Sequence, residues 1–166
     1  DALQKHNAKA TFFVVGNFIK DNPDLIKEMI AEGHTVGNHS VTHPSKGLPS
    51  QTMEQQQQEV MGCHQYVLDH FRYTMHLFRY PTGAFSEQSL AIVNNCNYKS
   101  VFWSFAYLDY DVNNQPDQTQ SLQKLVDRMH PGAIYLLHAE SETNTAILGS
   151  FIDQAKAAGY SLEAFD

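Results

Sequence analysis

Short apolar runs alternate with amphipathic stretches along the whole chain. Residues 10–15, Ala-Thr-Phe-Phe-Val-Val, are mostly β-branched or aromatic and are followed by Gly16, which is typical of a buried strand. Further strands are predicted at residues 34–38, 77–79, 101–106, 133–137 and 160–165. Because strand and helix patterns alternate about five times, the sequence predicts an α/β fold with a mainly parallel sheet.

The predicted helices are defined by capping residues and apolar stripes. Asn22 caps the first, Pro23 suits its first turn, and Gly33 ends it; its apolar stripe is Leu25, Ile26, Met29 and Ile30. Thr52 begins a helix that reaches about residue 71, and its inward positions include Met53, Val60, Val67 and Leu68. Ser86 begins a helix that reaches about residue 95, and two more are predicted at residues 118–129 and 143–158.

The composition of the chain narrows the possible classes of protein. The 166 residues suit one domain, and 42% hydrophobic residues supply a packed core. A net charge of −7 argues against a nucleic-acid groove, and no apolar run is long enough to cross a bilayer. Cys63 and Cys96 form no disulfide framework; one bridge or two separate thiols remain open, with the thiols favoured. We expect a monomer without a membrane span.

Several polar residues fall at one end of the predicted strands. Asn38 with His39, Arg79, Asp109 and His138 each lie at or just past the carboxyl end of a strand. That edge is where sites assemble in parallel barrels and in open α/β sheets. The candidate chemistry therefore lies on one face.

His39 and His43 are candidate metal ligands. Histidines four residues apart can hold one ion if the chain turns helically after the strand, although chance and surface pairs with this spacing are common. Catalytic zinc usually needs a third protein ligand, and none adjoins the motif. A purely structural zinc site fits poorly, because closed sites need about four ligands.

Two further motifs each leave two interpretations open. Arg79 precedes Tyr-Pro-Thr-Gly, so it is either a carboxylate-holding guanidinium beside an oxyanion loop or a surface residue before a turn. His138 is either a general acid or base oriented by the Asp109 carboxylate, or a histidine of the core. Aromatic residues near these positions, including Trp103 and Tyr110, either form the walls of a substrate site or belong to the core.

Taken together, these motifs resemble those of a known family. The following motifs occur in order along the chain: residues 10–16, the Gly-His-Thr-Val-Gly-Asn-His run at 33–39 with His43, the Arg-Tyr-Pro-Thr-Gly loop at 79–83, and Leu-Leu-His at 136–138. They resemble the polysaccharide deacetylases of carbohydrate esterase family 4, the NodB-homology domain, over essentially all of residues 1–166. Residues 101–116 resemble most the branch that deacetylates N-acetylmuramic acid in the peptidoglycan of the spore cortex.

The resemblance implies a role for each motif position. His39 and His43 match the two histidine ligands of a divalent metal, commonly Zn²⁺. Arg79 matches the residue that orients the catalytic base, and the amide near Thr82 would stabilise the oxyanion. Asp109 matches the carboxylate that tunes the acid, and His138 matches that acid. Substrate contacts are expected from Tyr80, Pro81, Trp103, Tyr110 and Asn113.

The resemblance also implies a fold and a reaction. We expect a distorted (β/α) barrel and metal-assisted hydrolysis of an N-acetyl group on peptidoglycan, which places the protein outside the cytoplasm. The family's Asp-Asp pair, which supplies the base and the third metal ligand, does not occur in the sequence. We therefore expect that the first strand lies upstream of Asp1 and that residues 1–166 alone are inactive.

Several alternatives remain. Thr82 replaces an aromatic residue or Arg, Ala106 replaces a frequent acid, and Tyr110 replaces a usual Trp. These differences concern substrate contacts more than the chemistry. The substrate can therefore be another glycan, such as chitin oligomers, N-acetylglucosamine in peptidoglycan or acetylxylan. From a different class, the chain can be a catalytically inactive barrel that binds glycan.

Overall fold

A computed structural model describes residues 2–165, which divide into two compact units. Residues 11–102 with residue 165 form the first, here called the sheet unit. Residues 2–10 with 103–164 form the second, here called the helical unit. The predicted site residues are shared between the two units, so each unit is described by itself.

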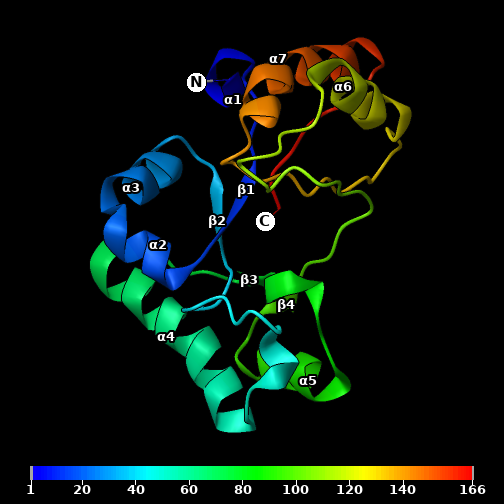
Figure 1. Ribbon diagram of the computed structural model, residues 1–166. Coiled ribbons are helices and arrows are strands. Elements are labelled where there is room, and N and C mark those ends of the chain that lie inside the picture. The colour runs from blue at the N-terminus through cyan, green and yellow to red at the C-terminus, as the bar shows by residue number, and fades with distance from the viewer. Residues whose placement is uncertain (1, 166) are drawn as a thin grey trace. The chain divides into compact units, whose positions relative to one another are not determined.

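The sheet unit is built around four parallel strands in the order β1-β2-β3-β4 (Figure 1). All four are short, and β1 and β2 make the longest pairing, from Thr11 opposite Thr35 to Val14 opposite Asn38. The elements in chain order are β1 (Thr11–Val14), α2 (Gly16–Asp21), α3 (Pro23–Ala31), β2 (Thr35–Asn38), the 3₁₀ turn η1 (Leu48–Ser50), α4 (Met53–Phe71), β3 (Leu77–Phe78), the 3₁₀ turn η2 (Pro81–Gly83), α5 (Glu87–Asn95) and β4 (Lys99–Ser100).

The core of the sheet unit lies between its strands and helices. Val36 and Phe78 on the strands are buried together with Ile19, Ile26 and Val60 on the helices. In Figure 1, α2, α3 and α4 lie to the left of β1 and β2. This packing is the physical reason that the predicted apolar runs at β2 and β3 become strands, since these strands bury side chains against the helices.

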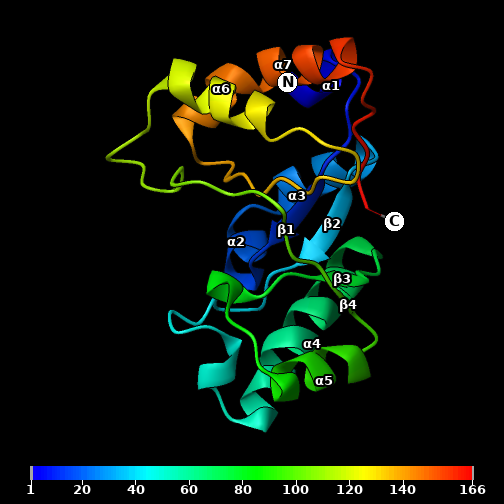
Figure 2. The same ribbon diagram turned by 90° about the vertical axis from the view of Figure 1, so that its right-hand side faces the viewer.

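The helical unit contains α1 (Ala2–Lys5), α6 (Gln118–Asp127) and α7 (Glu142–Ala157). Helices α6 and α7 lie side by side in both views (Figures 1 and 2), and Leu125, Ile147 and Phe151 are buried in their shared core. Beneath them the chain makes one parallel bridge, between Phe105 and Tyr135.

Three predicted strands are wrong among the described residues. Residues 101–106 and 133–137 keep only the Phe105–Tyr135 bridge, and residues 160–165 form no strand. At the first pair, the hydroxyl of Ser104 accepts from the Ile134 N–H at 2.7 Å and takes the place of a ladder bond. At the last, Phe165 bonds to the hydroxyls of Thr11 and Thr35 rather than to a strand backbone.

The predicted helices are confirmed with small changes in their bounds, and two details are corrected. Leu25 is 45% exposed and Met53 is 60% exposed, so neither belongs to the inward face. Asn22 makes no side-chain cap on α3, whereas Thr52 and Ser86 cap α4 and α5 through reciprocal capping boxes. Helices α1 and α2 were not predicted. Within residues 2–165, no helix combines the length and apolarity needed to cross a membrane.

Candidate active site

The predicted site residues form two clusters, one in each unit. The sheet unit carries His39, His43, Arg79 and the loop of residues 80–83. The helical unit carries Trp103, Asp109, Tyr110, Asn113 and His138.

His39 is held by the backbone at the carboxyl end of β2. Its N–H donates to the Val14 carbonyl at 3.0 Å, which continues the β1–β2 ladder by one residue. Its ring Nδ1 lies 2.7 Å from the Arg79 carbonyl oxygen, which can only accept a hydrogen bond. Nδ1 therefore carries the proton, and the lone pair of the neutral imidazole is on Nε2. This arrangement, a backbone carbonyl orienting the ring, is usual for metal-binding histidines.

His43 ends the loop that begins at His39. It adopts a left-handed conformation with φ of 54°, its N–H donates to the Ser40 hydroxyl at 3.0 Å, and its side chain is exposed. The two imidazole rings lie edge to face with centroids 4.9 Å apart. The two rings are close enough together for both to reach one divalent ion. Within residues 2–165 no group of three or more His, Cys, Asp or Glu residues is placed to hold a metal. Metal binding by the pair stays a prediction.

Arg79 follows β3 and connects the ends of three strands. Its N–H donates to the Asn38 carbonyl of β2 at 3.0 Å, and its carbonyl receives His39. Its guanidinium carbon lies 4.2 Å from the centre of the Phe13 ring on β1. Burial lowers the pKa of the Arg79 side chain to about 10, so this group stays protonated at neutral pH. A fixed cation at this edge is suited to holding a carboxylate.

The loop after Arg79 is anchored by two of its own side chains, which are buried beneath it. Tyr80 is 1% exposed, and its hydroxyl bonds to Ser89 and Ser100; Pro81 is also buried. The expectation that these two side chains contact substrate therefore does not fit the structure, because both support the loop from beneath. Thr82 is exposed and left-handed, with φ of 60°. A Cβ on Gly47 would lie 2.9 Å from the Thr82 hydroxyl, so glycine allows the close approach of residue 47 to this loop.

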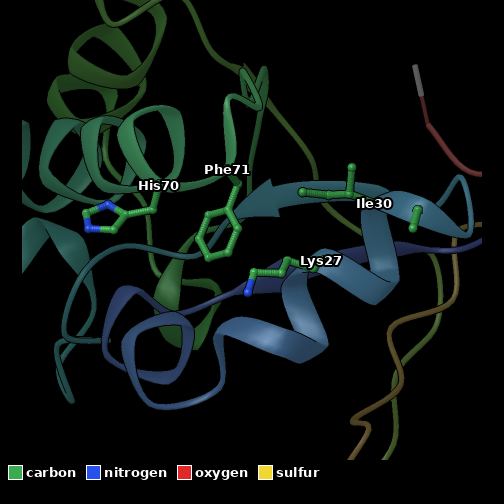
Figure 3. Close-up of a pocket in the computed structure, with 5 residues that line it drawn as sticks. Lys27, Ile30, His70 and Phe71 are labelled. Carbon is green, nitrogen blue, oxygen red and sulfur yellow. The ribbon is translucent and has the colours of Figure 1, made fainter.

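A groove of about 280 Å³ lies elsewhere on the sheet unit (Figure 3). Lys27 and Ile30 of α3 face His70 and Phe71 of α4 across it, with Ala31 also lining it. None of the predicted site residues lines this groove. It is mostly apolar and carries no candidate chemistry.

Asp109 is the centre of the second cluster. Its carboxylate is fully buried and accepts the Nδ1–H of His138 at 2.7 Å and the backbone N–H of His138 at 2.8 Å. The side-chain amide of Asn144 on α7 donates a third hydrogen bond at 2.5 Å. Both carboxylate oxygens are therefore engaged, and His138 is fixed at two points.

The charge of Asp109 is stabilised by these contacts. Burial by itself raises the pKa of Asp109, but the hydrogen bonds from the His138 ring and backbone and from Asn144 outweigh burial, and the net pKa lies below 3.8. An ionised Asp109 holds the proton of His138 on Nδ1, so Nε2 is the ring nitrogen that exchanges protons with the surroundings. The His138 side chain is 37% exposed and can reach another molecule.

The Gln115 side chain holds the Asp109 loop against the start of α7. The Gln115 amide nitrogen donates to the carbonyls of Asp109 and Asp111, at 3.1 and 2.8 Å. Its amide oxygen accepts from the Ser141 hydroxyl at 2.7 Å and from the Thr143 N–H at 3.1 Å. One side chain therefore joins the segment before α6 to the first turn of α7.

The other predicted residues of the helical unit are placed as follows. Tyr110 is 55% exposed, and its ring lies edge to face with His138 at 5.6 Å. Asn113 is exposed and Trp103 half-buried. Substrate contact by these three residues stays a prediction.

Sequence reasoning missed Glu59, Gln115 and Asn144. Each makes at least one hydrogen bond to a residue 17 or more positions away. A polar residue on a predicted helix gives no local signal for such a partner.

Comparison with known proteins extends these observations. The sequence model described as "Polysaccharide deacetylase" matches residues 1–101. The peptidoglycan-N-acetylmuramic acid deacetylase PdaA of Bacillus subtilis is 40% identical over 167 residues, with 100% of this chain and 63% of PdaA covered. A chitooligosaccharide deacetylase of Rhizobium leguminosarum is 34% identical over 144 residues, with 83% of this chain and 62% of that protein covered. The chain thus spans just under two thirds of these relatives.

Solved structures agree with the fold. The structure of PdaA, a family 4 carbohydrate esterase, matches with a TM-score of 0.92 at 39% identity, over 99% of this chain and 70% of that one. A family 4 pseudoenzyme from Bacillus anthracis matches with a TM-score of 0.91 at 26% identity, over 99% of this chain and 56% of that one. The predicted parallel α/β fold of the deacetylase type is therefore confirmed.

Proposed function

Because this chain belongs to the polysaccharide deacetylase family, we propose that it carries the active-site residues of an enzyme that hydrolyses the N-acetyl group of N-acetylmuramic acid in peptidoglycan. The predicted family is confirmed by the match over residues 1–101. The choice of sugar is supported by the 40% identity to PdaA. Since peptidoglycan lies outside the cytoplasmic membrane, the protein would act there, and we propose that it acts as a monomer.

The observation that carries the proposal is the two-point contact between Asp109 and His138. A buried, ionised carboxylate fixes both the position and the tautomer of the imidazole. This is the arrangement of a general acid, which must hold a proton on its outward nitrogen and release it at the right moment. A histidine that served only the core would not need both its ring and its backbone bonded to one carboxylate.

His138 would give the proton on Nε2 to the nitrogen of the leaving amine as the bond to the acetyl carbon breaks. Asp109 stabilises the protonated ring before the transfer, because its negative charge lies 2.7 Å from Nδ1. Proton transfer by a positioned side chain contributes a rate factor of about 10²–10⁴. The exposed ring of Tyr110 beside His138 would form part of the wall against which the sugar lies.

His39 and His43 would hold a divalent metal ion, with Zn²⁺ as the proposed ion. When bound, such an ion polarises the acetyl carbonyl and lowers the pKa of a coordinated water. The chain's own contribution is the orientation of His39 by the Arg79 carbonyl, which keeps Nε2 unprotonated.

Arg79 and the loop after it would complete the sheet unit's part. The charged Arg79 would orient a carboxylate base, and the exposed Thr82 amide would donate to the developing oxyanion. The sequence contains no Asp-Asp pair, so no residue of this chain is assigned as the base. We retain the prediction that residues 1–166 alone are inactive.

The test is acetate release from peptide-free peptidoglycan glycan by the complete product of the gene that encodes this chain, with Zn²⁺ supplied. We expect release that stops with a chelator and returns with the metal. His39→Ala and His43→Ala should abolish metal binding, whereas His138→Ala should keep the metal and lose most of the rate. Equal release from chitin oligomers or acetylxylan would contradict the choice of sugar.

A second function is an inactive glycan-binding protein. The similarity to a family 4 pseudoenzyme favours this alternative. It predicts that the complete protein binds peptidoglycan glycan but releases no acetate from any of these substrates.

A further inference from the structure

The loop between His39 and His43 is held from one side by a single carboxylate of α4. Glu59 Oε2 accepts the backbone N–H groups of Val41 and Thr42, each at 2.9 Å. Glu59 Oε1 accepts the Thr42 hydroxyl at 2.6 Å. The carboxylate therefore binds the two peptide groups that lie midway between the candidate metal ligands.

The same loop is held from the other side by the start of α2. The N–H of Gly16 donates to the Ser40 carbonyl at 2.8 Å, and the N–H of Asn17 donates to the Val41 carbonyl at 3.0 Å. A Cβ on Gly16 would lie 3.0 Å from the Val41 Cα, so the two backbones are in close contact. The loop is thus clamped between Glu59, which accepts from its N–H groups, and α2, which donates to its carbonyls.

The clamp acts on a backbone that would not hold this shape by itself. Ser40 and His43 both adopt left-handed conformations, with φ of 68° and 54°. Such conformations are unfavourable for residues with a Cβ and persist only where the surroundings fix them. The left-handed turn at His43 sets the direction of its ring, so whatever fixes the loop also fixes the second ligand.

We propose that Glu59 is a positioning residue that pre-forms the His39–His43 loop for metal binding; this inference rests on the ligand assignment of the proposed function. A carboxylate suits the task because both oxygens only accept, and three donors face them. A glutamine keeps the size but loses the negative charge that strengthens all three bonds, and its NH₂ group replaces one of the two acceptor atoms by a donor. Part of the free energy of metal binding would then be used to order the loop, and the observed affinity would fall.

The experiment is a titration of the metal-free chain with Co²⁺, which reports both affinity and ligand geometry through its absorption spectrum. We expect Glu59→Gln to bind Co²⁺ about 10–100-fold more weakly than the unmodified chain, as is usual when the support of a metal ligand is lost, and with an altered spectrum. The matched control is Glu54→Gln on the same helix, whose exposed carboxylate accepts a hydrogen bond from the Gln58 side chain at 3.5 Å. Its affinity should stay within about twofold.

A second readout does not depend on the metal. Hydrogen exchange of the Val41 and Thr42 amides in the metal-free chain should be faster in Glu59→Gln, while amides of β1 stay protected. If Glu59→Gln does not fold, Thr42→Val provides the test, since it removes the hydroxyl bond and leaves both amide bonds; we expect a roughly two- to fivefold loss of Co²⁺ affinity.

Two results would overturn the inference by different routes. A folded Glu59→Gln that binds Co²⁺ as tightly as the unmodified chain, with unchanged amide exchange, would show that Glu59 does not position the loop. An unmodified chain that retains Co²⁺ equally well after His39→Ala and His43→Ala would overturn the ligand assignment, and the inference would fall with it.

Discussion

The two clusters of candidate catalytic residues are held in place by different means. In the sheet unit, His39 and Arg79 continue backbone ladders, since their N–H groups donate to Val14 and Asn38 on neighbouring strands. In the helical unit, Asp109 and His138 follow segments that share one bridge, and side chains do the fixing. Backbone ladders are redundant, whereas a buried polar network depends on each member. The helical unit should therefore be the more sensitive to single substitutions.

The largest effect is expected at Asp109. Asp109→Asn removes the charge that stabilises the protonated His138 and replaces an acceptor oxygen by a donor. We expect acetate release to fall about 10²–10⁴-fold. The helical unit should also lose about 3 kcal/mol of unfolding free energy, because buried donors lose their partner. Steady-state kinetics of the complete gene product measure the rate, and urea unfolding measures the free energy.

The matched control for Asp109 is the exposed Asp111. Asp111→Asn removes a neighbouring charge of the same type and should leave both quantities nearly unchanged. Full activity in Asp109→Asn would mean that the carboxylate does not serve His138 in the reaction.

The same carboxylate predicts a pH dependence of stability. The pKa of Asp109 is lower in the folded chain than its ordinary value of 3.8, so the folded state binds fewer protons than the unfolded state in acid. The stability that the Asp109 carboxylate contributes is complete above pH 3.8, and it is lost as the pH falls through the pKa of the folded chain. Urea midpoints measured between about pH 2 and 7 should fall in acid, and Asp109→Asn should reduce that slope. An unchanged slope would contradict the assigned pKa direction.

A buried amide in the sheet unit should give a smaller effect on function. The Asn38 side chain donates to the Val60 carbonyl and the Tyr98 hydroxyl and accepts from the Ser40 N–H. Asn38→Ala should cost about 3 kcal/mol of unfolding free energy, measured in urea, because these groups stay buried without partners. Since the backbone bonds of His39 and Arg79 remain, we expect less than a tenfold loss of acetate release. A loss as large as that of Asp109→Asn would refute the contrast between the two units.

The smallest effects are expected at two helix caps. Ser86 caps α5 in the sheet unit, and Ser141 caps α7 in the helical unit. Each alanine variant should lose about 1 kcal/mol of unfolding free energy. Ser141 also donates to Gln115, so Ser141→Ala should lose about 1 kcal/mol more and slow acetate release, whereas Ser86→Ala should not. If Ser141→Ala and Ser86→Ala lost the same stability in thermal unfolding and the same rate of acetate release, the result would argue against a role for Gln115.

Much of the sheet unit could be predicted because its signals are local. Strand β1 and helices α3, α4 and α5 follow from apolar periodicity and, for α4 and α5, from capping boxes four residues long. Residues 101–106 have the same apolar pattern as a strand, yet only one bridge forms. Local pattern cannot distinguish the two, because a strand also needs a partner for its backbone.

The sequence indicated the candidate site residues but not the contacts that hold them in place. His39, Arg79, Asp109 and His138 were expected at strand ends, and the structure places the first two directly after β2 and β3. Tyr80 was expected to contact substrate, and it is buried instead. An aromatic residue in a motif gives no indication of which way its side chain points.

The sequence by itself determined strands β1–β3 and helices α3–α7 in their order and the capping boxes of α4 and α5, because each depends on neighbours within about one helical turn. It also indicated which polar side chains are candidates for the chemistry. Only the tertiary structure decided what holds those groups in place. Helix α2 has no side-chain cap, and its first N–H groups bond to residues 40 and 41. The same loop is bound by Glu59, and Asp109 is bound by Asn144, 35 residues away. Such contacts form when distant segments fold together, so local sequence pattern carries no record of them.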